Sequence, residues 1–362
     1  MDRRHLLTGF LSLGVVRPAW GQSQAAPFPG GASPSRRSPM ERTSRLTLKP
    51  SGPIESQADG QVIENLDIEA SSGHAISIVH DGVTVRHCRI RHAGGHGVHA
   101  DGSARLALEN LEIDHTGAPP RGVGPDEYRN NVNLVRCPGA SLARIRASRG
   151  ASNIRLDESP RSRLSFVELH DARGPFPRGQ NVQFSESPNS LLEDFSGENG
   201  PSSWTEDNIS VFRSNKTIIR RGFVSYNNSP TGFAVMVEGS FDCLVEDVDA
   251  VQQGNGAFAA VPNDDVGSGG CRFHRCRTRD TYNSPRDSRD APTSNSLSIY
   301  TLRSERAEKH TVTDCAYYNL ANPQNLIWDL DAVKAGWSFT ARNFVPRSPV
   351  RLHFGWDVSA SE

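Results

Sequence analysis

Charged and aromatic residues gather in four segments of this sequence, residues 117–129, 173–180, 199–206 and 226–232. Carboxylates hydrogen-bond hydroxyl groups or hold Ca²⁺, arginines pair with carboxylates, and aromatic rings stack on the apolar faces of sugar rings. This mixture of side chains therefore suits an elongated groove for an acidic sugar polymer. The candidate binding residues in and beside the segments are His99, Tyr128, Arg129, Gln180, Gln183, Trp204, Glu206, Tyr226 and Glu238.

The same part of the sequence supplies acidic residues that could work in pairs. Hydrolysis of a glycosidic bond uses two carboxylates about 5 to 9.5 Å apart across the scissile bond. If the segments stack above one another, Asp171 with Asp207, or Asp207 with Glu238, would meet this requirement. Glu206, Asp207 and Glu238 are also the candidate calcium ligands, because Ca²⁺ prefers carboxylate oxygens.

A repeated phrase predicts that these segments do stack. It consists of an apolar residue, a second one three positions later and a third after two more, as in Val85, Cys88 and Ile90. Successive copies begin 22 to 39 residues apart, and 22 is the recurring minimum. Self-similarity at such a period marks a solenoid, whose coils carry loops of variable length. The four segments are insertions at the same place in successive coils, so they should form one rim.

Upstream of the repeated phrase, short alternating runs predict strands with one buried face. No segment shows a helical period. The pattern resembles the right-handed parallel β-helix of the pectate-lyase-like superfamily, over roughly residues 52–345. The predicted fold is therefore all-β, a single-domain solenoid of about ten coils. The runs cover 75–78, 97–100, 131–134, 153–156, 181–184, 208–211 and 234–237, and their outward positions include His99, Asn133, Arg155, Gln183, Ser210 and Met236.

The resemblance implies a chemistry for residues 173–178. Their sequence, Arg-Gly-Pro-Phe-Pro-Arg, has the R-x-P-x-x-R form found around the catalytic arginine of pectate lyases. In that family an arginine is assigned the role of base, and the guanidinium fork suits neutralisation of a uronic acid carboxylate. Arg178 is then the candidate base or carboxylate anchor, and Arg173 supports it. The W-x-D-H segment typical of pectate lyases is absent.

Other activities hosted by related β-helices remain open. Polygalacturonases carry acidic pairs upstream of a Gly-His-Gly, whereas here residues 95–97 precede Asp264 and Asp265, so these are interpreted as turn residues. Mannuronan C5-epimerases use the same proton abstraction as lyases, although their D-P-H-E segment is missing. Some β-helices only bind or export glycans. We expect a polysaccharide lyase that cleaves an acidic polysaccharide by β-elimination, with a hydrolase, an epimerase or a non-catalytic binding protein as alternatives.

The start of the chain predicts export. Arg3 and Arg4 precede an apolar run that ends near Val16, followed by a small-x-small cleavage site, as in a twin-arginine signal. The mature protein is expected to be a periplasmic or secreted monomer without membrane insertion. The predicted divisions are a signal peptide over residues 1–21, a flexible spacer over 22–50, the β-helix over 51–345 and a C-terminal cap or tail over 346–362.

The net charge and the positions of the cysteines and histidines limit which partners and cofactors the sequence predicts. The net charge of −1 argues against a nucleic-acid partner. Cys243 and Cys271 occupy equivalent positions of successive coils, as do Cys276 and Cys315, so each pair could form a disulfide or simply fill the core. The clustered N-terminal histidines lie in different registers, which argues against a zinc or copper site. Calcium is the one cofactor that the acidic residues suggest.

Overall fold

The computed structural model describes residues 46–119, 129–174, 179–229, 231–281, 300–302, 309–318 and 337–358. All of them belong to one compact unit, Ser44–Glu362. The predicted signal peptide, Tyr128 and Arg178 lie outside the described residues. Within these ranges, no helix has the length and apolarity that a membrane span requires.

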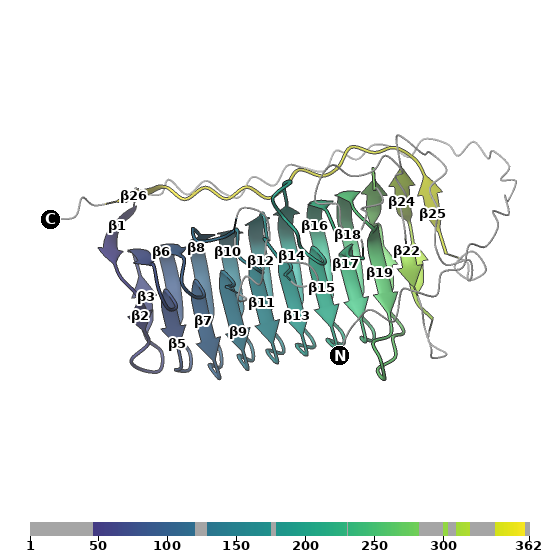
Figure 1. Cartoon of the computed structure of the whole chain (residues 1–362). Helices are drawn as coiled ribbons and strands as arrows, with labels where there is room; N and C mark the ends of the chain where they lie inside the picture. Colours follow the sequence, from purple (N-terminus) through teal and green to yellow (C-terminus); the bar gives the residue numbers. More distant parts are fainter. Residues whose placement is uncertain are drawn as a thin grey trace, which may run out of the picture. The chain divides into compact units, whose positions relative to one another are not determined.

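The described chain is a stack of about nine coils whose strands form two parallel sheets (Figure 1), so the predicted all-β solenoid is confirmed. In each coil a short strand is followed by a longer one. The long sheet contains β1 (Leu46–Ser51), β3 (Val62–Glu64), β4 (Leu66–Ala70), β6 (Thr84–His92), β8 (Ala107–His115), β10 (Ser141–Ser148), β12 (Arg163–His170), β14 (Leu191–Glu198), β16 (Ile218–Asn227), β18 (Leu244–Gln253), β20 (Arg272–His274), β21 (Arg277–Arg279), β23 (Thr311–Thr313), β24 (Cys315–Tyr318), β25 (Phe339–Ala341) and β26 (Trp356–Val358). The short sheet contains β2 (Ile54–Glu55), β5 (Ile76–Ile78), β7 (Val98–Asp101), β9 (Val132–Val135), β11 (Ile154–Asp157), β13 (Val182–Ser185), β15 (Ile209–Phe212), β17 (Phe233–Glu238), β19 (Gly256–Val261) and β22 (Tyr300–Leu302).

The first strand begins inside the range that was predicted to be a spacer. Lys49 to Ser51 of β1 pair with Leu66 to Ile68 of β4, and Leu48 is fully buried. The spacer prediction rested on the density of Pro, Ser, Gly and Arg over residues 22–50. Composition averaged over a range cannot reveal one buried leucine within it. The structure shows that β-structure starts at Leu46 rather than at residue 51.

The repeated phrase keeps its three apolar residues on one side because the backbone bends within it. In a straight strand, residues three positions apart face opposite sides. In β6, His87 has a φ of 53° between Val85 and Cys88. This left-handed residue resets the alternation, so Val85, Cys88 and Ile90 are all fully buried. The equivalent left-handed residues are Asn65, Asn110, Arg144, Phe166, Asp194, Arg221, Asp247, Arg275 and Asp314.

A line of buried side-chain amides ties the coils together beside the short sheet. The asparagine ladder consists of Asn131, Asn153, Asn181 and Asn208, all fully buried. Each of the first three donates from Nδ2 to Oδ1 of the next, over 2.7 to 2.9 Å. Asn208 donates in turn to Gln253, and His92 Nε2 lies 2.7 Å from Asn131 Oδ1 at the other end. Buried amides need such partners, so this ladder enforces the coil register.

Gly222 replaces the middle apolar residue of the phrase in β16. A Cβ at this position would lie 2.1 Å from Cζ of Phe195, which is the equivalent residue of the preceding coil. Phe195 is only 1% exposed. The glycine therefore makes room for a phenylalanine ring that fills the space of two coils.

All six cysteines are buried free thiols in this structure. Cys243 and Cys271 do lie at equivalent positions of neighbouring coils, since Val245 pairs with Phe273. Of the two interpretations that the sequence left open, apolar thiols that fill the core describe this structure. Burial raises the pKa of the Cys88 thiol to about 11, which makes it a poor nucleophile.

The C-terminal residues 337–358, here called the strap, run back along the outside of the long sheet (Figure 1, yellow). At one end β25 pairs with β24, and at the other β26 pairs with β1. The strap therefore supplies the last strand at both edges of the long sheet. Exposed sheet edges invite pairing with other chains, so a segment that covers both edges opposes aggregation. The sequence predicted a C-terminal cap or tail over residues 346–362.

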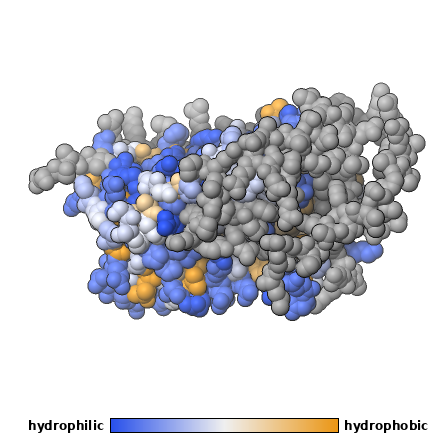
Figure 2. Space-filling model, viewed as in Figure 1, coloured by the Kyte–Doolittle hydropathy of each residue, from blue (hydrophilic) through white to orange (hydrophobic). Residues whose placement is uncertain are grey.

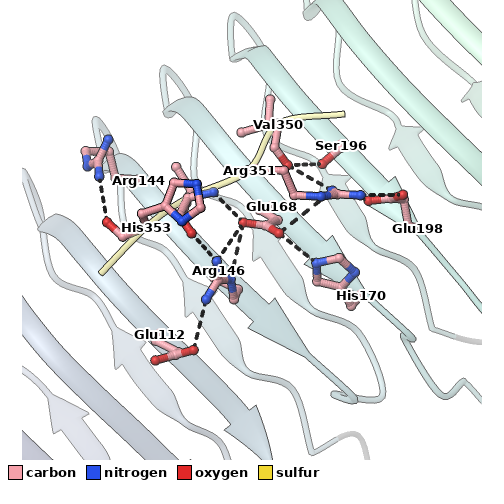
Figure 3. Close-up of polar contacts among 11 residues, drawn as sticks. Glu112, Arg144, Arg146, Glu168, His170, Ser196, Glu198, Val350, Arg351 and His353 are labelled. Carbon is pink, nitrogen blue, oxygen red and sulfur yellow. Dashed lines mark hydrogen bonds and ion pairs between the residues drawn. The ribbon is translucent and has the colours of Figure 1, made fainter. Parts of the chain in front are cut away.

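Between its ends the strap is held by charged side chains of the long sheet (Figure 3). The Leu352 amide donates to Glu168 Oε2 over 2.6 Å, and the Glu168 side chain also meets Arg146 and His170. Ser196 donates to the Val350 carbonyl, and Arg351 pairs with Glu198. Although burial acts to raise it, the hydrogen bonds from His170, Leu352 and Arg146 lower the pKa of Glu168 to about 2.

Gly222→Ala should destabilise the protein by about 1 to 3 kcal/mol, because the new methyl group overlaps the Phe195 ring. Urea unfolding of the variant measures this change. Phe195→Leu in the same chain removes the overlap, so the double variant should lose less stability than the sum of the two single variants. An additive double variant would contradict the proposed contact.

Strap attachment should depend on pH with a defined sign. The pKa of Glu168 is about 2 in the folded protein, below the ordinary 4.5, so the contact stabilises the strap above pH 4.5. It is lost as the pH falls from 4.5 towards 2. Hydrogen exchange of the Leu352 amide, corrected for intrinsic rate, should therefore accelerate over this range. In Glu168→Ala, which offers no acceptor, the exchange should be fast already at pH 7, and an unchanged amide would refute the role of the Glu168 side chain.

Candidate functional site

The outward face of the short sheet carries one row of side chains stacked from coil to coil. In-register pairing places His99 beside Asn133, Asn133 beside Arg155, and Arg155 beside Gln183. Ser210 and Met236 continue the row in β15 and β17. The outward positions predicted from the alternating runs are thus confirmed.

Arg155 is the one cation in the stretch of this row from His99 to Met236. It is partly exposed and pairs with Asp157 of the same strand over 2.6 Å. Its neighbours are more enclosed, since Asn133 is 8% and Gln183 7% exposed. Gln183 Oε1 is buried and accepts no hydrogen bond in the described part of the chain. Arg155 was not among the predicted binding residues, although a lone arginine in an outward row is a signal that the sequence contained.

Before several of the short strands, a side chain accepts the backbone amide of the equivalent residue in the next coil. His74 Nδ1 accepts the amide of His96, and His96 Nδ1 accepts the amide of Asn130, each over 3.0 Å. Asn130 Oδ1 accepts the amide of Ser152 over 2.9 Å. Asp207 does the same further along, where its Oδ1 accepts the amide of Phe233 over 2.7 Å. A candidate catalytic carboxylate thus has a structural role, which the sequence did not reveal.

Glu206 and Gln180 come together between neighbouring coils. Gln180 Nε2 donates to Glu206 Oε2 over 3.3 Å, and Glu206 is only 7% exposed. The backbone at Gly232 packs tightly against the backbone at Glu206, because a Cβ at Gly232 would lie 1.4 Å from the Glu206 carbonyl oxygen. Only glycine fits there, so the segments around residues 206 and 232 are packed directly against each other, as the predicted rim requires.

Glu238 lies at the end of β17 in a separate polar group. Its Oε1 accepts from Asn263 Nδ2 over 2.7 Å, and Asn263 Oδ1 accepts from Arg213. Within the ranges described above, no three or more acidic, histidine or cysteine side chains are arranged to hold a metal ion. The three candidate ligands Glu206, Asp207 and Glu238 therefore do not form a calcium site by themselves, and calcium stays a prediction.

Asp171 and Arg173 stand where the second charged segment leaves β12. Asp171 Oδ1 accepts the Gly200 amide over 2.6 Å, which joins this segment to the next one. Arg173 is 9% exposed, and its Nε and Nη1 atoms donate to no hydrogen-bond acceptor in the described structure. Burial lowers the pKa of the Arg173 guanidinium, an effect that nearby Asp171 opposes. Arg178, the predicted partner of Arg173, lies outside the described residues.

Of the predicted aromatic residues, the two that the structure describes, Trp204 and Tyr226, do not form an exposed platform. Trp204 is only 4% exposed, so its ring faces are not available to a sugar in this structure. Tyr226 lies at the end of β16 with a φ of 63°, and its carbonyl accepts from Asn199. Arg129 lies shortly before β9, and its Nη1 donates to the Ala93 carbonyl over 3.2 Å.

One face of the molecule is shown in Figure 2, and its coloured surface is mostly hydrophilic with small hydrophobic areas towards the lower edge. Among the described residues, the large apolar side chains that are exposed are Val62, Val79, Phe166 and Val345. Val62 lies in β3, Phe166 in β12 and Val345 in the strap, whereas Val79 follows β5, so these described residues form no broad apolar docking surface.

No protein-family model and no curated protein match the sequence. The structure is similar to the catalytic domain of a GH87 alpha-1,3-glucanase in complex with nigerose, with a TM-score of 0.55, 10% identity, and coverage of 78% of this chain and 54% of that one. A substituted form of such a domain with nigerose gives a TM-score of 0.54, 11% identity, and coverage of 82% and 61%. An alginate lyase from Paenibacillus sp. str. FPU-7 has a TM-score of 0.44, 10% identity, and coverage of 68% and 91%.

The likeness to the glucanase domains agrees with the parallel β-helix fold described above. The chain spans about half the length of the first glucanase structure that it matches. At this level of identity the similarity identifies the fold, and the same fold hosts many activities.

Asp207→Asn should leave the melting temperature nearly unchanged, because an asparagine Oδ1 can still accept the Phe233 amide. Asp207→Ala should cost about 1 to 3 kcal/mol, since a buried amide is left without a partner. Thermal unfolding of both variants separates the two cases. Equal destabilisation would show that the charge of Asp207, rather than its acceptor oxygen, supports the fold.

Proposed function

We propose that this protein is exported, binds an acidic polysaccharide along the outward face of the short sheet, and cleaves it by β-elimination. The observation that carries the proposal is Arg173, a buried guanidinium with two donors that meet no acceptor in the described residues. A buried cation is costly unless an anion or an acceptor compensates it. A uronic acid carboxylate does both, and its geometry matches the guanidinium fork.

The reaction needs a cation at the carboxylate and a base at the neighbouring carbon. The base removes the proton from that carbon, the electron pair forms a carbon–carbon double bond, and the bond to the glycosidic oxygen breaks. A fixed cation stabilises the charge that develops on the carboxylate group during this step. Arg173 is proposed as the cation and Arg178 as the base, while Asp171 steadies Arg173 through its charge.

Hydrolysis is the second candidate. Solved structures that are similar above a TM-score of 0.5 include glucanase catalytic domains in complex with nigerose. Asp171 and Asp207 are the carboxylates proposed for this route, since hydrolysis uses two acidic groups on opposite sides of the bond. The two routes differ in their products, because elimination leaves an unsaturated sugar and hydrolysis does not.

The test is incubation of the mature protein with pectate, alginate, glycosaminoglycans and bacterial exopolysaccharides, while ultraviolet absorbance and new reducing ends are recorded. Arg173→Gln should lower kcat/KM about 10- to 100-fold, the effect of losing a charge-assisted hydrogen bond of about 1.5 to 3 kcal/mol. The melting temperature should stay equal or rise, because the variant removes a buried charge without a partner. Arg178→Ala should abolish absorbing products, and a chelator arm tests calcium.

Arg163→Gln is the matched control, because Arg163 is exposed on the long sheet. It should keep full activity. New reducing ends without ultraviolet absorbance would show that the protein hydrolyses the polymer and does not cleave it by elimination. Binding without any product would leave a glycan-binding protein, and neither binding nor product on any of these polymers would refute the proposal.

A further inference from the structure

Three histidine rings meet at the N-terminal end of the same outward face. His74 precedes β5, His96 precedes β7, and His99 lies within β7. The ring centroids are 4.9 Å apart for His74 and His96, 4.5 Å for His74 and His99, and 5.2 Å for His96 and His99. All three residues are partly exposed. We call them the histidine cluster.

Backbone amides determine the tautomer of the first two rings. The His96 amide donates to His74 Nδ1, and the Asn130 amide donates to His96 Nδ1. A backbone N–H is always a donor, so neither Nδ1 atom carries a proton. Both neutral rings must then carry their proton on Nε2. The two rings are parallel within 6°, as expected for equivalent positions in stacked coils.

A chain of side-chain amides determines the tautomer of His99. The Ser152 amide donates to Asn130 Oδ1, which leaves Asn130 Nδ2 to donate to Asn133 Oδ1 over 2.9 Å. Asn133 Nδ2 must then donate to His99 Nδ1 over 3.1 Å. His99 therefore also carries its proton on Nε2.

The cluster stays uncharged near neutral pH. Burial and the neighbouring His74 lower the pKa of His96 to about 3. Burial lowers the pKa of His74 and of His99 as well, although Asp101 acts in the opposite direction on His99. Asp101 itself is paired with Arg136.

The three Nε2–H groups donate to no acceptor within the described residues, and none of these atoms is buried. The cluster thus offers three donors and no acceptor. Sugar hydroxyls both donate and accept, whereas an ionised oxyanion only accepts. Metal coordination does not suit these rings, because one nitrogen of each accepts an N–H and the other carries a proton.

We propose that His74, His96 and His99 form a binding site for an oxyanion, namely a carboxylate or sulfate group of the polysaccharide. That the anion belongs to a polysaccharide rests on the proposed function. His99 and Arg155 lie two strands apart on one face, roughly 9.6 Å by strand spacing, so one polymer can reach both. The cluster would bind a part of the polysaccharide that is distant from the bond that is cleaved.

The tautomers and the ligand can be tested together by long-range ¹H–¹⁵N correlation spectra of the full chain with ¹⁵N-labelled histidine. The three rings should show protonated Nε2 and unprotonated Nδ1. Sodium sulfate, a galacturonate trisaccharide and a neutral trisaccharide of the same length are then added separately. A shift of the Nε2 signals with the uronate only, or with sulfate only, identifies which oxyanion is bound. Equal shifts with the neutral sugar, no shift with any probe, or a protonated Nδ1 would overturn the proposal.

The chain itself provides a variant that removes the donors without losing the fold. Asn130 occupies the position of His74 and His96 in the next coil and accepts the following amide through Oδ1. His74→Asn with His96→Asn should therefore keep the melting temperature while weakening the affinity for the uronate trisaccharide about tenfold, the effect of two lost neutral donors. His87→Asn, the same change in β6 of the long sheet, should leave the affinity unchanged.

The outcomes separate this site from the proposed reaction. Raised KM with unchanged kcat in the double variant is expected if the cluster binds polymer away from the reacting bond. Unchanged KM with full cleavage would overturn the histidine site and leave the proposed function intact. Uronate or sulfate binding in a protein that cleaves nothing would support the site and refute the reaction.

Discussion

Turn amides that have no sheet partner are the constraint on which the rest of this structure depends. A backbone N–H that is removed from water without an acceptor costs free energy, so such turn amides need partners. The chain meets the need with side chains of the preceding coil, first His74 and His96, then Asn130 and Ser152. One residue further on, the asparagine ladder adds hydrogen bonds between the side chains of successive coils. Coil register is therefore fixed by polar bonds as well as by the apolar column.

The same bonds determine what the outward face can do chemically. Because Asp207 accepts a backbone amide, one of its oxygens is committed to structure before any substrate arrives. Because the histidine rings accept amides at Nδ1, their outer nitrogens are left as donors. Arg173 is the contrasting case, a buried cation that the fold leaves uncompensated at Nε and Nη1 in the described structure. The described structure thus contains polar groups that serve the fold as well as a cation whose donors the fold does not use.

The strap adds a long-range constraint to a fold that is otherwise built from neighbouring contacts. A solenoid coil touches little beyond the coils on either side of it. Here Arg347 reaches Asp249 of β18, Leu352 reaches Glu168 of β12, and Gly355 reaches Leu46 of β1. One segment thereby bridges the two ends of the long sheet, so coils that share no direct contact are coupled through it.

The sequence by itself determined the solenoid, the strand positions and the outward row, because apolar spacing and alternation reflect which side of a strand is buried. It did not reveal the left-handed residues as a set, because they include Arg, Phe and His as well as the Asn and Asp that favour this conformation. Nor did it predict the strap's path, which depends on contacts such as Leu352 with Glu168, far apart in sequence. For the candidate site, the sequence identified Arg173 and Asp207 as chemically suitable. Only the tertiary structure shows that Asp207 is hydrogen-bonded to the next coil. It also shows that two donors of Arg173 have no hydrogen-bond partner among the described residues. That difference depends on three-dimensional neighbours, which spacing along the chain does not encode.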